Sequence, residues 1–173
     1  SMEPLKYQEA PKDVLDAMNQ VVEHCPPEEG CFDGACILAC DAAANVQGTI
    51  GCDFWAPTPP FVFNGQPNVT QSGPCFAVFL ANTWGHPAKI AVARDGVALD
   101  IGQAARLATP GVAPKDWPPL PAEGVPPDAV GVVFLSSDPN SIMPENKVPL
   151  TCPVTPAVNM STVIPKSGRG AAF

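Results

Sequence analysis

Charged side chains are scarce in this sequence, and basic ones are scarcer than acidic ones. Only 15% of the 173 residues are charged, and nine Lys and Arg oppose seventeen Asp and Glu, for a formal net charge of −8. A nucleic-acid binder needs a basic face for phosphates, and an anionic membrane surface attracts basic segments. The charge balance therefore argues against nucleic acid and against an anionic membrane surface as partners.

Long hydrophobic runs are also missing. The longest, Phe76 to Ala81, has six residues, whereas a membrane helix needs about 18 or more. No membrane insertion is expected. Apolar residues nevertheless make up 46% of the chain, which is too many for a wholly disordered protein and enough for a conventional core.

Catalytic motifs are absent as well. The sequence has no Gly-x-Ser-x-Gly, His-Glu-x-x-His, P-loop or dinucleotide-binding motif. A serine or cysteine nucleophile needs a base, and the chain has only two histidines, His24 and His86. We expect no enzyme and no cofactor. The alternative is a secreted hydrolase or metal-dependent enzyme in which His86 acts with turn carboxylates; the candidates are Asp53, Asp95, Asp100, Asp116 and Glu123.

Cysteine, by contrast, is abundant for this length. The seven are Cys25, Cys31, Cys36, Cys40, Cys52, Cys75 and Cys152. Zinc sites usually present paired Cys-x2-Cys knuckles, which the first four cysteines do not form, so disulfides are favoured over metal. We expect the first six to form disulfides of unknown pairing and Cys152 to remain unpaired, in an oxidising compartment.

Proline is the other abundant residue, and it disfavours a helical bundle. Short runs with turn signals between them predict strands, and Asp95-Gly96 predicts a tight hairpin turn. Phe76–Asn82 and Val130–Ser136 are expected to be central strands. Residues 109–128 contain seven prolines and are interpreted as a surface crossover anchored by Trp117, rather than as a polyproline ligand. The remaining predicted strands are Thr49–Trp55, Pro60–Phe63, Lys89–Arg94, Val97–Ile101 and Val158–Ile164.

The fold class predicted from these patterns is mainly β: an antiparallel β-sandwich-like domain with a short N-terminal helix and a small disulfide-rich knob. Helical spacing of apolar residues assigns residues 1–24 to the helix, with a packing stripe formed by Val14, Leu15, Met18, Val21 and Val22. Residues 25–52 form the knob, which is too short to build a core alone. Residues 53–173 form the β-domain.

Candidate binding residues are few. Trp55, Trp84 and Trp117 are the candidates for a sugar-stacking or protein-binding surface, although aromatic residues in β-domains are more often core. Turn carboxylates could bind calcium, but no Asp-x-Asp-x-Asp loop is present, so no metal is expected. These carboxylates are Asp33, Asp41 and Asp138. Two glycosylation sequons begin at Asn68 and Asn159.

Two stretches together suggest a family. The knob sequence Cys31 to Cys40 is followed by Gly48 to Trp55, and then Cys75 to Asn82 leads into Pro87 to Val92. This order resembles the IgGFc-binding-protein N-terminal domain family as found in bacterial secreted proteins and lipoproteins, from about residue 25 to residue 173. The resemblance implies a secreted or surface-anchored β-rich domain without catalytic residues. Family members continue past a stretch similar to Gly170–Phe173, so the chain resembles a truncated member.

Together these observations predict an extracellular or cell-surface binding or adhesion module, although the sequence contains no recognisable signal segment. Its expected partner is another protein chain or a glycan. Residues 158–173 are expected to pair with a missing C-terminal portion or with a second copy, because a cut sheet exposes an edge. A structural surface component is a further alternative to the hydrolase.

Overall fold

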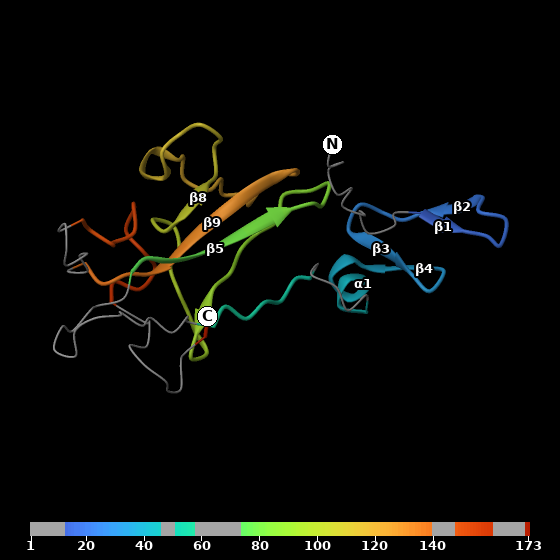
Figure 1. Cartoon of the computed structure of the whole chain (residues 1–173). Helices are drawn as coiled ribbons and strands as arrows, with labels where there is room; N and C mark the ends of the chain where they lie inside the picture. Colours follow the sequence, from blue (N-terminus) through green and yellow to red (C-terminus); the bar gives the residue numbers. More distant parts are fainter. Residues whose placement is uncertain (1–12, 46–50, 58–73, 140–147, 161–171) are drawn as a thin grey trace, which may run out of the picture. The chain divides into compact units, whose positions relative to one another are not determined.

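The structure is a computed structural model that describes residues 13–45, 51–57, 74–139, 148–160 and 172–173. By its contacts the chain forms two compact units: unit 1 contains residues 1–54 and 84–86, and unit 2 contains residues 55–83 and 87–173. Strands predominate in the described residues, which confirms the mainly β prediction (Figure 1). The observed sheets are small and have two or three strands each.

Unit 2 is built around a three-stranded antiparallel sheet with the order β5-β9-β8 (Figure 1). Its strands are β5 (Phe76–Asn82), β8 (Ala105–Leu107) and β9 (Ala129–Ser136). The register runs from Phe76 opposite Ser136 to Asn82 opposite Ala129. The central position predicted for β9 is confirmed, and six of its eight residues are buried. The prediction is wrong for β5, which lies at an edge of the described sheet.

The core of unit 2 is formed by apolar residues of β9 and its neighbours. Val133 and Leu135 are essentially inaccessible to solvent, and they cluster with Ala105 and Phe173. The Phe76 and Phe173 rings are tilted against each other with centroids 6.1 Å apart. A buried amide adds a polar link, since Asn82 Nδ2 donates to the Val125 carbonyl at 2.9 Å. The described core of unit 2 is therefore centred on β9.

The predicted Asp-Gly hairpin is present but short. β6 (Ala93–Arg94) and β7 (Val97–Ala98) flank Asp95 and Gly96, whose φ angles are 52° and 76°. Two positive φ angles are what a two-residue turn of this kind requires. The pairing continues one step further, because Leu99 N donates to the Val92 carbonyl.

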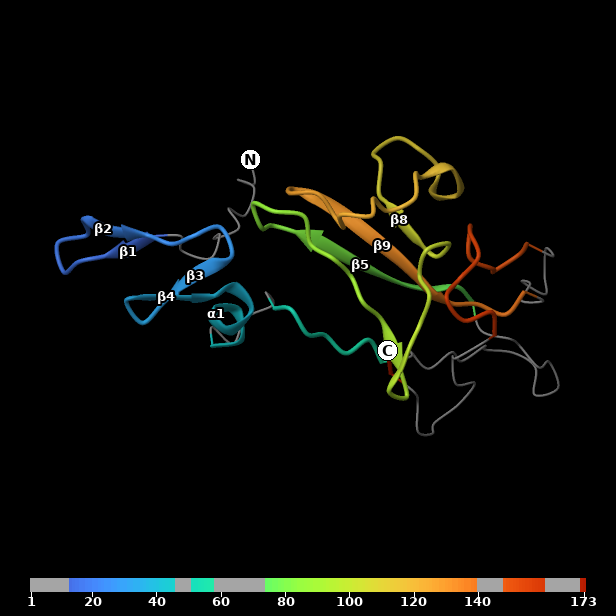
Figure 2. The ribbon, with the colours of Figure 1, turned by 180° about the vertical axis from the view of Figure 1, so that it is seen from behind.

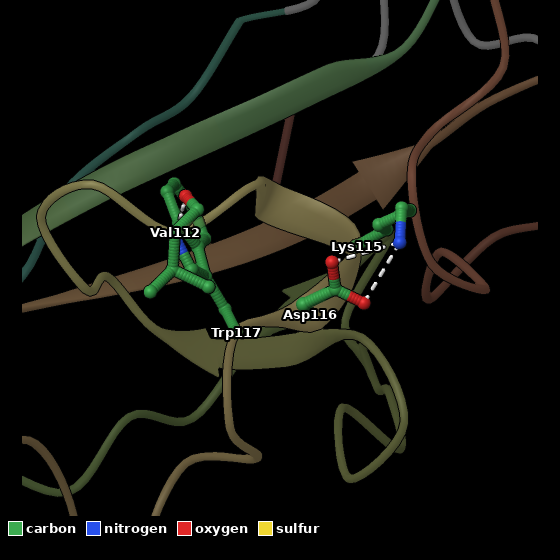
Figure 3. A network of polar contacts seen from close by, with 4 residues as sticks. All are labelled: Val112, Lys115, Asp116 and Trp117. Atoms are coloured by element: carbon green, nitrogen blue, oxygen red, sulfur yellow. Dashed lines mark hydrogen bonds and ion pairs between the residues drawn. The ribbon is translucent and has the colours of Figure 1, made fainter.

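Part of the proline-rich crossover of residues 109–128 lies along β8. Leu107 N donates to the Pro118 carbonyl, and Leu120 N donates to the Ala105 carbonyl. A 3-10 turn, η1 (Pro114–Asp116), precedes Trp117. The Trp117 indole N–H reaches the carbonyl oxygen of Val112 at 3.0 Å (Figure 3). It also lies 3.2 Å from the carbonyl oxygen of Thr109. The same loop carries a Lys115–Asp116 ion pair at 2.7 Å.

The prediction of an N-terminal helix over residues 1–24 is wrong for residues 13–24, the part that the structure describes. Residues 13–24 form a β-hairpin of β1 (Asp13–Leu15) and β2 (Val21–His24) (Figures 1 and 2). The physical reason is a turn in the middle of the helical pattern: the Asp16 carboxylate accepts bonds from the backbone N–H groups of Met18 and Gln20. Asn19, with φ of 59°, adopts the left-handed conformation. Side-chain bonds of Asp to nearby backbone compete with helix formation.

The knob contains a second hairpin and the α-helix of the described residues. β3 (Glu29–Phe32) and β4 (Ala35–Leu38) flank a turn at Asp33 and Gly34, and α1 (Ala39–Asn45) follows. The predicted strand Thr49–Trp55 is wrong for residues 51–55, which carry no strand. Pro60–Phe63 lies outside the described residues. Of Val158–Ile164, Val158 forms a parallel bridge to Ser136.

Disulfides hold both units, as expected, but one prediction about the cysteines is wrong. The bonds are Cys25–Cys36, Cys40–Cys52 and Cys75–Cys152. Cys152 is therefore paired, and the free thiol belongs to Cys31. The sequence count of seven was compatible with either outcome, because the pairing depends on spatial register rather than on order along the chain.

Candidate binding surface

The β1–β2 hairpin of unit 1 exposes most of its apolar side chains. Met18 at the turn is 78% exposed and Val22 is 61% exposed, while Leu15 and Val21 lie opposite each other and are about half exposed. These four residues, Leu15, Met18, Val21 and Val22, are called the apolar hairpin surface below. Val14 alone among the apolar residues of the hairpin strands is buried. Clusters of exposed apolar residues often mark interaction sites.

Negative charge predominates in the segment that carries this surface. The segment 13–54 contains eight Asp and Glu and no Lys or Arg. Three of the acids, Asp13, Asp16 and Glu23, belong to the hairpin. At its base the Asp13 carboxylate lies 2.6 Å from His24 Nδ1, and both side chains are exposed. The hairpin therefore combines exposed apolar side chains with nearby carboxylates in the sequence. This combination favours a cationic partner.

Unit 1 has a very small interior. Its fully buried apolar side chains among the described residues are Val14 and Ala42. Gly30 lies so close to Ala42 that a Cβ at this glycine would sit 3.1 Å from the Ala42 Cβ. Trp84 lies beside this cluster. Its indole N–H donates to the Pro27 carbonyl at 3.0 Å. With so little buried area, the Cys25–Cys36 and Cys40–Cys52 bonds supply the constraint that a core would otherwise provide.

The three candidate tryptophans are divided between the two units. Trp84 belongs to unit 1, and Trp55 and Trp117 belong to unit 2. Trp84 and Trp117 are half-buried and bonded to backbone carbonyls, whereas Trp55 is 80% exposed. Whether any of them binds a ligand stays a prediction, and Trp55 is the one whose ring is accessible.

The residues considered for catalysis do not line the described cavity. This cavity, of about 270 Å³, lies in unit 2 and is lined by Lys89, Ile101, Leu120 and neighbouring residues, with no histidine or carboxylate among them. His86 is exposed and belongs to unit 1. Within the described ranges, no group of three or more His, Cys, Asp and Glu is arranged to hold a metal ion.

The calcium candidates occupy local structural positions. Asp33 has φ of 50° and occupies the β3–β4 turn, and Asp41 lies in the first turn of α1. Asp138 follows β9. Asn159 of the second sequon is exposed, and Asn68 lies outside the described residues.

Residues 158–173 were expected to pair with another chain, but part of this stretch packs against residues of unit 2. Val158 N donates to the Leu135 carbonyl, and Phe173 exchanges two backbone hydrogen bonds with Ala56. Arg94 also lies over the Phe173 ring, 5.6 Å from its centroid. Residues 161–171 lie outside the described ranges, so pairing of that segment with a second copy stays a prediction.

Comparison with known proteins yields no relatives: no family model, no curated protein and no solved structure matches the chain. The three disulfides suggest an extracellular or otherwise oxidising environment. None of the helices in the described part of the chain has the length and apolar character of a membrane-spanning helix.

Sequence reasoning missed the apolar hairpin surface, although it singled out the same residues. Val14, Leu15, Met18, Val21 and Val22 were assigned to one packing stripe of a helix. The signal that identifies the hairpin is Asp16 and Asn19 between two apolar pairs, since both residue types favour turns.

Proposed function

We propose that the protein is a secreted or cell-surface binding module without enzymatic activity, and that the apolar hairpin surface is its contact site. The observation that carries the proposal is the exposure of Leu15, Met18, Val21 and Val22 on a hairpin held by a disulfide-linked knob. A rigid support reduces the entropy lost on binding. The resemblance of the knob to the IgGFc-binding-protein N-terminal domain family, and a sandwich-like arrangement of the whole chain, belong to the same proposal.

The partner proposed is a protein surface that combines basic and apolar side chains. Charge complementarity supports this choice, because residues 13–54 carry eight carboxylates and no Lys or Arg. The chemistry of the hairpin also favours protein over glycan. Sugars stack on aromatic faces, whereas the exposed hairpin residues are aliphatic or thioether side chains.

A random peptide display library selected on the full chain tests this proposal. The enriched peptides should combine Lys or Arg with apolar residues, and their binding should weaken as salt is raised. The double substitution Met18→Ser and Val22→Ser should abolish most of this binding, because it removes apolar contact area without changing charge.

Val97→Ser is the matched control, because Val97 is 65% exposed on the β6–β7 hairpin of unit 2. It should leave peptide binding unchanged. Enrichment of acidic or purely polar peptides, or equal binding to the wild type and the double variant, contradicts the proposal.

A further inference from the structure

Three cysteines of unit 1 gather around one strand pair. Cys36 on β4 is bonded to Cys25, with a Cα–Cα distance of 5.3 Å. Cys31 on β3 carries the free thiol, and it is the direct register partner of Cys36. Opposite residues of an antiparallel pair project from the same face, with Cα atoms about 4.5–5.5 Å apart. Cys31 therefore projects from the same face of the hairpin as a disulfide-bonded sulfur.

The hairpin geometry also permits a bond between Cys31 and Cys36. Disulfides form between residues whose Cα atoms are about 4.4–6.8 Å apart, and opposite positions of an antiparallel pair satisfy this range. The register is held by the turn residues Asp33 and Gly34, whose φ angles are 50° and 77°. Cys36 therefore has two partners within bonding reach, one across the hairpin and one in the loop after β2.

We propose that Cys25, Cys31 and Cys36 form a thiol–disulfide exchange centre. The Cys31 thiolate attacks Sγ of Cys36, so that the Cys31–Cys36 bond forms and the Cys25–Cys36 bond breaks. Cys25 leaves as a thiolate and takes up the equivalent of the proton that Cys31 lost. One thiol and one disulfide are present before and after the step, so no oxidant or reductant is required.

The exchange changes how the two hairpins of unit 1 are connected. Cys25 directly follows β2, so its bond to Cys36 links the end of the β1–β2 hairpin to β4. After exchange, the cross-link lies within the β3–β4 hairpin, and the main chain is the connection that remains between Cys25 and Cys36. All three cysteines are partly or largely shielded but none is fully buried, so an alkylating reagent can reach them. The bond that the exchange breaks is the one that links the β1–β2 hairpin to the knob in the proposed function, but the geometry behind the exchange does not depend on binding.

Alkylation of the full chain followed by peptide mapping without reduction tests the proposal. Cleavage after Asp and Glu separates Cys25, Cys31 and Cys36, because Glu28, Glu29 and Asp33 lie between them, and added chymotrypsin cleaves after Leu38 to separate Cys36 from Cys40. The attacking species is the thiolate, whose fraction rises with pH, so labelling is compared at about pH 6 and about pH 9. At the lower pH the label should be on Cys31. At the higher pH it should divide between Cys31 and Cys25, with a new Cys31–Cys36 linked peptide.

Two variants keep the interpretation unambiguous. Cys31→Ser should leave Cys25 unlabelled at both pH values, because the attacking thiol is gone. Cys25→Ser should form the Cys31–Cys36 bond under mild oxidation, with the Cys40–Cys52 linked peptide as its internal check on folding. Label confined to Cys31 at both pH values, labelling of Cys25 in Cys31→Ser, or two free thiols in the folded Cys25→Ser variant overturns the proposal.

Discussion

The two units differ in charge and in what stabilises their folded structure. Residues 1–54 contain ten Asp and Glu against two Lys, whereas residues 55–173 contain seven of each sign. Unit 1 buries little beyond Val14 and Ala42 and has two disulfides; unit 2 buries most of β9 and has one. Cross-links lower the entropy of the unfolded chain, and a core gains free energy by removing apolar area from water. A segment that is stabilised by cross-links can leave its apolar side chains exposed.

Reduction of the disulfides should produce the largest difference between the units. The Cys25–Cys36 and Cys40–Cys52 bonds span 11 and 12 residues, and loops of this size are worth about 3 kcal/mol each. Reduced protein should lose amide protection in Glu29–Leu38 while β9 remains protected. Hydrogen exchange read by mass spectrometry makes this measurement.

The control for that experiment removes the cross-link of unit 2 alone. Cys75→Ala with Cys152→Ala opens a loop of 77 residues, which costs about 4.5 kcal/mol in the chain-entropy model. Unit 2 should become less stable, yet β3–β4 should keep its protection. Loss of protection in β9 before β3–β4 on reduction contradicts the comparison.

Leu135→Ala should be the most damaging single substitution tested in unit 2. Leu135 is 1% exposed in the core cluster, and truncating a buried leucine costs about 3 kcal/mol. The denaturation midpoint of unit 2 should fall accordingly. Phe79→Ala is the control, because Phe79 is 67% exposed and its loss should change stability by less than about 0.5 kcal/mol. Equal effects of the two variants would show that β9 does not form the core.

Asn82→Ala should have a smaller effect confined to unit 2. The substitution removes the 2.9 Å bond from the buried amide to the Val125 carbonyl, and a neutral hydrogen bond contributes about 1 kcal/mol. Thermal unfolding measures the loss. Exchange rates in β3–β4 of unit 1 should not change, because the lost bond lies within unit 2, and a change there would contradict an effect confined to unit 2.

Asp16→Ala should have the smallest effect and should be confined to the β1–β2 hairpin. It removes the carboxylate that accepts the Met18 and Gln20 N–H groups, at a cost of about 1 kcal/mol. NMR chemical shifts of residues 13–24 should move toward random-coil values. Gln20→Ala, which keeps the backbone N–H, should leave those shifts in place, and equal responses to the two substitutions would disprove the role of Asp16.

The parts of unit 2 that could be predicted from sequence are those determined by local chemistry or a strong pattern. The mostly apolar segment Val130–Ser136 predicted the buried strand β9. Asp95-Gly96 predicted the turn between β6 and β7, because few residue pairs accept two positive φ angles. The edge position of β5 could not be predicted, since an apolar strand has the same pattern wherever it lies in a sheet. The Trp117 anchor was predicted, but not the carbonyl oxygens that it contacts.

In unit 1 the sequence predicted cross-links but neither their pairing nor the exposure of the apolar hairpin surface. The sequence alone did not show which of Cys31 and Cys36 is bonded. The structure places them opposite each other on β3 and β4, pairs Cys36 with Cys25 and leaves Cys31 as the free thiol. The apolar residues at 14, 15, 18, 21 and 22 satisfy helical spacing, and one carboxylate bonding to two backbone N–H groups was enough to favour a hairpin. Short segments without a core depend on such single interactions, so periodicity is a weak guide there.

The Cys75–Cys152 bond makes the intervening chain a covalent ring that encloses β5 through β9. A protease that cuts once anywhere inside this ring opens it without releasing a fragment. The nicked protein keeps its full mass on a non-reducing gel, and separates into two pieces only after reduction. The bond therefore keeps the two pieces of this unit covalently joined after a single proteolytic cut.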